Sequence, residues 1–420
     1  MRFPQVNFLV LLNAILFALN SLSFGGDLAQ QKVKVGADVL IEKRFDLIKG
    51  KRVGIVCNHT ALLSDGGHLV DVLYGRPDVK VVALFGPEHG IRGDAPDGKS
   101  IEHGMDAKTH VPVYSLYGKT TKPTDEMLKG VDVLVFDIQD IGARFYTFIS
   151  TLSLAMEAAA EHHIPYIVLD RPNPIRGTWV EGPIREDSLK SFVGLQPIPV
   201  VHGMTVGELA TMFNQEHWLK NGVKANLTVV KMEGWRRGMW YDETGIQWVR
   251  PSPNMPTMKT AVVYPGACLI EGTNVSEGRG TERPFEYLGA PWIDGKKLSD
   301  ELNSHKLPGV KFVAVQFTPV DIERVTVDPK FEGQNCGGIL INVTDRNVYE
   351  PLRTGVCLVS ALKKLYPNDF AFRTQRFDRL MGVSWVREMI NAGKSPEEIT
   401  KRWRQDEEEF KELREKYLLY

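Results

Sequence analysis

The sequence predicts an α/β protein with a doubly wound, mainly parallel sheet domain followed by a smaller C-terminal α/β domain. Between residues 50 and 230, short runs rich in Val, Ile and Leu alternate with amphipathic helical patterns. This alternation is typical of parallel sheets whose crossover helices cover both faces. Beyond residue 260 a glycine-rich stretch precedes further strand and helix patterns. We therefore place a domain boundary there, giving domains at 35–260 and 261–420.

Four nearly continuous apolar runs predict strands of the first domain. A strand with helices above and below it has no polar face to expose, so its sequence does not alternate. The four runs are KRVGIVCN, VKVVALFG, VDVLVFDI and IPYIVLDR, at residues 51–58, 79–86, 131–138 and 164–171. Two further runs predict strands of the second domain, at residues 311–320 and 336–345.

Helical patterns lie between and after these runs. The clearest covers residues 145–163 and ends before Pro165, which cannot continue a helix. In the pattern over 205–219, Thr205 and Glu208 have the spacing of a capping box. The second domain has helical patterns at residues 349–367 and 384–393, and a charged amphipathic helix with a solvated face at 396–420.

The first 25 residues have the layout of a secretory signal peptide. Arg2 precedes an apolar run over residues 8–19, and small residues follow that run. Asn13 keeps the run below the roughly 20 apolar residues that a spanning helix needs. No cysteine follows it, which argues against a lipid anchor. We expect a secreted or periplasmic protein with no membrane span after removal of residues 1–25.

Composition argues against nucleic-acid binding and a zinc site. The 51 Lys and Arg residues balance 52 Asp and Glu residues, so there is no overall basic field for nucleic acid. The four cysteines are not grouped at metal-ligand spacing, and we expect neither a metal nor a cofactor. Cys57 and Cys268 lie in apolar, strand-like segments and are predicted to be buried, whereas a bridge between Cys336 and Cys357 stays open.

Polar motifs follow each predicted strand of the first domain. They are NHT, GPEHG, DIQDIGARFYT and DRPNPIRG, at residues 58–60, 86–90, 137–147 and 170–177. Ligands of open α/β sheets bind outside the carboxyl ends of the strands, so these loops form a candidate site rim.

Glu88 is the first candidate for a catalytic carboxylate. It lies just after a buried strand, in a turn fixed by Gly86, Pro87 and Gly90. Partial desolvation there would raise its pKa toward the value that a general acid needs. The alternative is an ordinary surface turn in which Glu88 only caps a neighbouring group.

The stretch GDAPDGKS, residues 93–100, fits the pattern of a phosphate-binding loop. The preceding strand pattern ends at Phe85, however, and no helical stripe follows Ser100. Asp94 and Asp97 would also face a polyanion. We therefore predict no ATP site.

The remaining loops supply the groups that a sugar-binding cleft uses. Amides and acids bind hydroxyls, aromatic faces stack on sugar rings, and arginine pairs with a carboxylate. Some of these side chains are expected to pair only with each other. The candidates are Asn58, His89, Asp137, Gln139, Asp140, Arg144, Tyr146, Asn173, Arg176, Glu181, Asn274, Arg279 and Glu282.

Several motifs resemble a known family. VGIVCNHT, LFGPEHGIRGDAPDG, VDVLVFDIQDIGARFYTFI, LDRPNPIRG, PVVHGMTVGELA, RPSPNMP and EGTNVSEGRGTERPFE are similar to those of the DUF1343 family. Its characterised members are exo-β-N-acetylmuramidases known as NamZ. The resemblance implies release of terminal, non-reducing β-1,4-linked N-acetylmuramic acid from peptidoglycan fragments. It also implies a Rossmann-like N-terminal domain, a smaller C-terminal domain and a site in the cleft between them.

The implied reaction gives the candidates roles. Glu88 is the preferred catalytic carboxylate, with His89 as a tuning group or sugar ligand. Asp137, Asp140, Glu181 and Glu282 stay possible as the second carboxylate, unless the 2-acetamido group of the substrate takes that role. Arg144, Arg176 and Arg279 are candidates for the lactyl carboxylate. Two other readings stay open, namely another hydrolase or transferase on this scaffold, or a non-catalytic glycan-binding protein. Oligomeric state, stereochemistry and tolerance for peptide stems stay open too.

Overall fold

The computed structural model describes residues 32–93 and 103–420, and its largest element is a seven-stranded sheet. The sheet order is β3-β4-β2-β1-β5-β6-β7, and all neighbours are parallel except β3 and β4. The strands are Arg52–Cys57 (β1), Lys80–Gly86 (β2), Gly104–Met105 (β3), Pro112–Ser115 (β4), Val133–Asp137 (β5), Tyr166–Leu169 (β6) and Leu227–Val230 (β7). The order reverses at β1, which lies between β2 and β5. The predicted doubly wound sheet is therefore confirmed.

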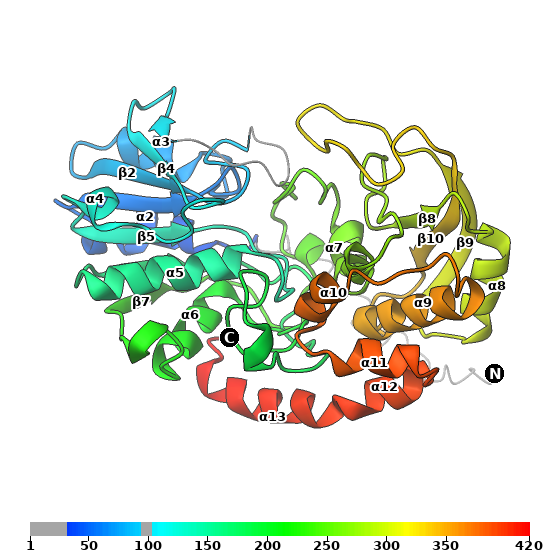
Figure 1. The fold of residues 1–420 in the computed structure, drawn as a ribbon. Helices are drawn as coiled ribbons and strands as arrows, with labels where there is room; N and C mark the ends of the chain where they lie inside the picture. The colour runs from blue at the N-terminus through cyan, green and yellow to red at the C-terminus, as the bar shows by residue number, and fades with distance from the viewer. Residues whose placement is uncertain (1–31, 94–102) are drawn as a thin grey trace, which may run out of the picture. The chain divides into compact units, whose positions relative to one another are not determined.

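Helices cover both faces of this sheet (Figure 1). Residues of α2 (Gly36–Lys43) and α3 (Leu69–Tyr74) share one apolar cluster with Val53 and Ile55. Residues of α5 (Phe148–Glu161) and α6 (Val206–Gln215) share another with Val56. Consecutive β1 residues thus face opposite clusters, which is why the run reads as continuously apolar. The short α4 (Asp125–Leu128) precedes β5.

The predicted capping box at the start of α6 is confirmed. The Thr205 hydroxyl accepts from the Glu208 backbone N–H, and the Glu208 carboxylate accepts from the Thr205 backbone N–H. The two side chains thereby satisfy N–H groups that a helix start leaves without partners.

A second, antiparallel sheet has the order β8-β10-β9. Its strands are Tyr287–Ala290 (β8), Val310–Phe317 (β9) and Cys336–Val343 (β10). Helix α8 (Gly295–Ser304) contacts β9 and β10, and α9 (Pro351–Leu365) contacts α8 (Figure 1). Both strands predicted for this part of the chain, at 311–320 and 336–345, are therefore present.

The glycine-rich stretch after residue 260 does not form the predicted long loop throughout. Helix α7 (Met258–Ala267) continues into a 3-10 turn, η5 (Cys268–Gly272), so Cys268 is not in a strand. A β-carbon on Gly266 would lie 1.9 Å from the Pro351 carbonyl oxygen. The glycine is thus required where α7 crosses closely over α9, a packing that local sequence does not reveal.

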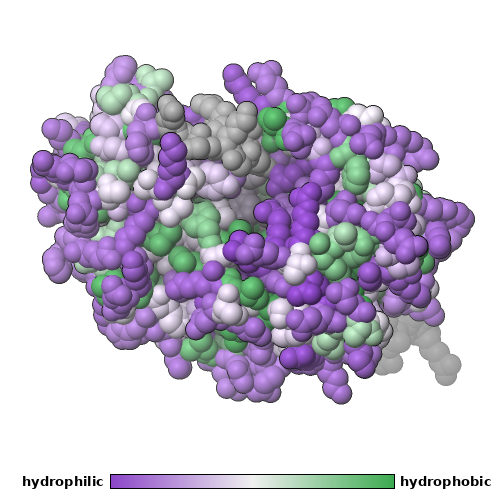
Figure 2. All heavy atoms as spheres, in the orientation of Figure 1, coloured by the Kyte–Doolittle hydropathy of each residue, from purple (hydrophilic) through white to green (hydrophobic). Residues whose placement is uncertain are grey.

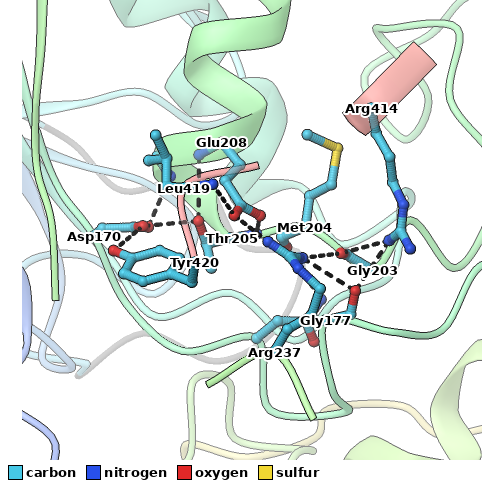
Figure 3. Close-up of polar contacts among 12 residues, drawn as sticks. Asp170, Gly177, Gly203, Met204, Thr205, Glu208, Arg237, Arg414, Leu419 and Tyr420 are labelled. Carbon is cyan, nitrogen blue, oxygen red and sulfur yellow. Dashed lines mark hydrogen bonds and ion pairs between the residues drawn. The ribbon is translucent and has the colours of Figure 1, made fainter. Parts of the chain in front are cut away.

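The C-terminal segment forms four helices, of which the second is the helix predicted at 384–393, and the third and fourth replace the single helix predicted at 396–420. They are α10 (Thr374–Met381), α11 (Trp385–Asn391), α12 (Pro396–Arg402) and α13 (Arg404–Arg414), followed by a 3-10 turn at Glu415–Tyr417. The pattern over 396–420 breaks at Trp403, which is buried. Helix α13 leads back to the first sheet, so the chain ends beside α6 (Figures 1 and 3).

Residues Val33–Tyr420 form one compact unit, and one apolar cluster includes residues of both sheets. The boundary near residue 260 therefore stays a proposal. All four cysteines are free and buried, including Cys336 and Cys357. Within residues 32–93 and 103–420, no helix is long and apolar enough to cross a membrane. Hydrophilic side chains cover most of the face in Figure 2. The expected signal peptide and most of the GDAPDGKS stretch lie outside the described residues.

Candidate functional site

A cavity brings together four residues that the sequence analysis selected. Glu88, His89, Tyr146 and Arg279 all line it. The other lining residues are Phe145, Thr147, Phe148, Ser252, Met255, Tyr264 and Phe285. An acid, a cation and aromatic rings thus share one space, which is the composition expected of a saccharide pocket.

The GPEHG turn presents Glu88 to this cavity. Strand β2 ends at Gly86, and the Gly90 N–H donates to the Pro87 carbonyl at 3.0 Å, which closes the turn. His89 has a φ of 73°, in the left-handed region that non-glycine residues rarely adopt. His89 is buried, whereas Glu88 is partly exposed. A strained backbone held in place by its surroundings is a frequent feature of functional sites.

Aromatic rings form one wall of the cavity. The Tyr264 ring meets Phe145, Tyr146 and Phe285 edge to face, with centroids 5.5, 5.8 and 4.7 Å apart. Tyr146 in turn meets Phe148 at 4.9 Å. Such mutual edge contacts fix each ring, so the wall is rigid. The sequence analysis selected only Tyr146 from this group. Two other lining residues, Met255 and Phe285, lie within the RPSPNMP and EGTNVSEGRGTERPFE motifs.

Arg279 enters from the segment between α7 and β8. Its Nη2 donates to Glu271 Oε1 at 3.0 Å, and its Nε lies 3.4 Å from Glu277 Oε1. The guanidinium carbon lies 5.0 Å from the centroid of the Phe285 ring. Acids on one side and an aromatic ring on another therefore orient the cation at the cavity.

Other predicted site residues connect the rim loops to each other through hydrogen bonds and an ion pair. Asp137 is fully buried and its two oxygens accept from Arg171 Nε and Nη2 at 2.5 and 2.9 Å. The Gln139 side chain donates to the Asp140 and Pro172 carbonyls, both at 2.7 Å. These contacts join the loop after β5 to the loop after β6.

Three further predicted side chains have similar local roles. The Asn58 side chain accepts from the Thr60 N–H and hydroxyl, and Asn173 donates to the Met204 carbonyl. Asp140 Oδ2 accepts from the Gly142 N–H at 2.7 Å and lies 3.7 Å from His202 Nε2. Asn58, Asp137, Gln139, Asp140 and Asn173 therefore hold the loops, and none of them lines the cavity described above.

Arg144 has a different environment from the one expected of a substrate ligand. It is fully buried and donates to the carbonyls of Pro183, Ile198 and Leu380 at 3.3, 2.9 and 2.7 Å. Burial and the nearby Arg185 charge lower its pKa to about 9. These contacts cross-link three segments of the chain, and Arg144 does not line the cavity described above.

Arg176 also lies outside the cavity lining. It donates to the Gly238 carbonyl at 3.2 Å and to Asn347 Oδ1 at 3.4 Å, and its guanidinium lies over the Trp240 ring. Asn274 joins its loop to the segment before α10, through the Asp369 carbonyl and the Ala371 N–H.

Glu181 caps a helix, and Glu282 faces solvent. The Glu181 carboxylate accepts from the Leu352 and Arg353 backbone N–H groups at the start of α9, at 3.0 and 2.7 Å. Burial raises the pKa of Glu181 to about 8. It lines a separate pocket with Trp179, Glu350 and Glu407. The Glu282 side chain is 78% exposed. Of the five carboxylates considered for catalysis, only Glu88 therefore lines the cavity with Arg279.

No group of three or more His, Cys, Asp or Glu side chains that could hold a metal ion occurs in the described part of the chain.

Two family models match nearly the whole described chain. Residues 53–259 match the N-terminal model of the exo-β-N-acetylmuramidase NamZ family, and residues 262–420 match its C-terminal model. The peptidoglycan β-N-acetylmuramidase NamZ of Bacillus subtilis (strain 168) is 50% identical over 390 residues, which cover 93% of this chain and 92% of that protein.

Two crystal structures of DUF1343 family proteins from Bacteroides fragilis NCTC 9343 have the same fold. One superposes with a TM-score of 0.86 at 40% identity, and covers 93% of this chain and 99% of its own. The other has a TM-score of 0.77 at 38% identity, with the same coverage. The resemblance inferred from the sequence motifs is confirmed.

Proposed function

We propose, from the premise that this chain belongs to the exo-β-N-acetylmuramidase NamZ family, that it is a glycosidase acting on peptidoglycan. The reaction is hydrolysis of the β-1,4 bond that joins a terminal, non-reducing N-acetylmuramic acid to the rest of a peptidoglycan fragment. The observation that carries the proposal is the single cavity lined by Glu88, Arg279 and a rigid aromatic wall.

Each group of the cavity has a task in this reaction. Glu88 donates a proton to the glycosidic oxygen as the bond breaks, which is general acid catalysis. Arg279 pairs with the lactyl carboxylate that distinguishes N-acetylmuramic acid from N-acetylglucosamine. The faces of the aromatic rings pack against the sugar.

The second group of the mechanism comes from the substrate in this proposal. Among the described lining residues, Glu88 is the only carboxylate. The carbonyl oxygen of the substrate's 2-acetamido group attacks the anomeric carbon while Glu88 protonates the leaving oxygen. Water then opens the cyclic intermediate, with Glu88 accepting the water proton. This substrate-assisted course predicts that the product keeps the β configuration.

A site shared by two domains is part of the same proposal. Glu88, Tyr146 and Met255 precede residue 260, whereas Tyr264, Arg279 and Phe285 follow it, and all six line the cavity. We also propose export from the cytoplasm. This rests on the signal-peptide layout of residues 1–25 and on the location of peptidoglycan outside the cytoplasmic membrane. Sequencing the N-terminus of the protein purified from a bacterial host would test the cleavage.

The activity is tested with two disaccharides of opposite order. We expect release of N-acetylmuramic acid from a fragment with that sugar at its non-reducing end, and no release of sugar from a fragment that ends in N-acetylglucosamine. Proton NMR during the first turnovers reports the configuration of the product. Binding of the first disaccharide without hydrolysis would instead indicate a glycan-binding protein, and an α product would contradict the substrate-assisted course.

A further inference from the structure

Glu271 lies behind Arg279 and is shared by two arginines. It belongs to η5, and its side chain is 8% exposed. One carboxylate oxygen accepts from Arg279 Nη2 at 3.0 Å, and the other accepts from Arg376, which comes from α10. Burial alone would raise the pKa of Glu271, but the two guanidinium groups outweigh it and hold the pKa at about 2. Glu271 is therefore a permanently charged link between the two cations.

The backbone at Arg279 is fixed on both sides. Gly278 and Gly280 have φ values of 76° and 78°. A β-carbon on Gly278 would lie 2.4 Å from the Tyr287 carbonyl oxygen, and one on Gly280 would lie 2.5 Å from the Val320 carbonyl oxygen. Only glycine fits both positions without strain. The backbone conformation around Arg279 is therefore fixed independently of the contacts of its side chain.

A second carboxylate supports the arginine from another direction. Glu277 Oε1 lies 3.4 Å from Arg279 Nε, and Glu277 Oε2 accepts from Lys330 Nζ at 2.8 Å. Lys330 also donates to the carbonyls of Val275 and Ile270, at 2.8 and 3.3 Å. Glu277 is therefore held by a lysine that is itself fixed to the backbone.

Three cations and two anions among the described residues form this cluster. Arg279, Arg376 and Lys330 are cations, whereas Glu271 and Glu277 are anions. Arg279 is the cation of this cluster that lines the cavity. Arg279 therefore places a positive charge of this cluster at the cavity.

We propose that Glu271 is a positioning residue that holds Arg279 at the cavity, and that Glu271 thereby sets the preference for sugars bearing a carboxylate. The inference rests on the proposed function, since it assigns Arg279 to the lactyl group. Without the Glu271 charge, Arg279 and Arg376 would repel each other. Arg279, which is 23% exposed, would then turn toward solvent.

The sign of the effect separates positioning from simple electrostatics. Replacing Glu271 by Gln raises the charge of the cluster, so a long-range field alone would strengthen the binding of a carboxylate. If Arg279 instead loses its position at the cavity, the binding of a carboxylate becomes weaker. The direction of the change in affinity, and its dependence on the carboxylate of the sugar, therefore distinguish positioning from a long-range field.

The test compares the Glu271→Gln variant with the wild-type protein in calorimetric binding of N-acetylmuramic acid and N-acetylglucosamine. We expect the ratio of the two affinities to fall by about tenfold, the scale of one charge-assisted hydrogen bond. On the disaccharide substrate, KM is expected to rise by more than kcat falls, because the contact is made with the bound sugar. An unchanged ratio, or tighter binding of N-acetylmuramic acid, overturns the inference.

Two further variants control for folding. Asp378 on α10 is also buried, and accepts from Arg387 Nε and Nη2, both at 2.8 Å, but it does not line the cavity. Asp378→Asn should lower the melting temperature and leave the affinity ratio unchanged, and a fall in the ratio for this variant overturns the inference. If Glu271→Gln does not fold, Glu277→Gln decides, with a smaller fall expected and an unchanged ratio contradicting the proposal. A wild-type protein that hydrolyses neither disaccharide would instead refute the proposed function.

Discussion

Glu88 and Arg279 line the same cavity, although Glu88 follows strand β2 and Arg279 precedes strand β8 in the second sheet. One is a carboxylate at the end of a buried parallel strand, and the other is a cation held by two acids. An acid and a cation at one cavity allow separate tasks, because proton transfer needs the first and recognition of an anionic substituent needs the second. Substitutions at Glu88 should therefore change turnover, whereas substitutions at Arg279 should change selectivity.

Replacing Glu88 by Gln should lower turnover by at least about a hundredfold, the usual scale for loss of a general acid or base. The variant should keep its fold, because Glu88 is partly exposed in a turn that closes through backbone groups. Initial rates on the muramyl disaccharide and circular dichroism measure the two effects. Glu282→Gln is the matched control, since its side chain is 78% exposed and should not affect the rate. A near-normal rate in a folded Glu88→Gln variant would remove Glu88 from the mechanism.

Replacing Arg279 by Met should reduce the preference for muramides over N-acetylglucosaminides by about ten- to a hundredfold, since hydrogen bonds to charged groups contribute roughly 1.5–3 kcal/mol. The measurement is kcat/KM on paired glycosides that differ only in the lactyl group. Arg176→Met serves as the control, because Arg176 lies outside the cavity lining. Equal selectivity in the wild-type and Arg279→Met proteins would exclude Arg279 as the lactyl ligand.

Replacing Arg144 by Met should destabilise the protein by about 2 kcal/mol or more, because three carbonyl groups would lose their donor inside the protein. Urea unfolding measures this change. Selectivity between the paired glycosides should be unaffected in the folded fraction. A stable Arg144→Met variant with altered selectivity would restore Arg144 as a substrate ligand.

The sequence alone predicted the elements that have a strong local pattern. Strands β1, β2, β5 and β6 are continuous apolar runs, and α6 begins with a capping box. Strand β7 was not predicted. It is a four-residue edge strand with three residues only partly buried, so it lacks the long apolar run of the central strands. Helix α7 was missed because Pro265 and Gly266 indicate a loop, whereas Gly266 is required by its contact with α9.

The candidate site was predictable to a smaller extent. The loop after β2 had a clear signal, since Glu88 and His89 follow a buried strand within a glycine-bounded turn. The three candidate arginines could not be distinguished from the sequence. The carbonyls that surround Arg144, for example, come from residues 183, 198 and 380. Long-range packing assembles the environment of Arg144, and no local pattern encodes it.

Replacing Glu181 by Gln should change the pH dependence of stability. Burial raises the pKa of folded Glu181 to about 8, from the ordinary value of 4.5. Between these values the folded state binds a proton that the unfolded state lacks, so wild-type stability decreases as the pH rises. The Gln variant should therefore become more stable relative to wild type between pH 5 and 8.5.

Chemical unfolding of both proteins across this range measures the difference, and other titrating groups contribute equally to both. The pH dependence of kcat/KM should be the same in the two proteins, since Glu181 does not line the cavity with Glu88. Loss of one limb of that profile in Glu181→Gln would instead identify Glu181 as a catalytic group.

Replacing the C-terminal Tyr420 by Phe should destabilise the protein, and more so at high pH. The Tyr420 hydroxyl donates to Asp170 Oδ2 at 2.7 Å (Figure 3). It also accepts from the Met232 N–H at 2.8 Å. Asp170 lies at the end of β6, next to Arg171, which pairs with Asp137. The last residue of the chain therefore supports the base of a rim loop.

Burial and the nearby Glu208 raise the pKa of Asp170 to about 7, so its carboxylate becomes charged as the pH rises through neutrality. A charged carboxylate needs its donors more than a neutral one does. The cost of Tyr420→Phe should therefore grow from about 1 kcal/mol at pH 6 toward about 3 kcal/mol at pH 8.5. Tyr74→Phe is the control, because Tyr74 is 52% exposed and should show neither effect. A cost for Tyr420→Phe that is the same at both pH values would show that the hydrogen bond does not depend on ionised Asp170.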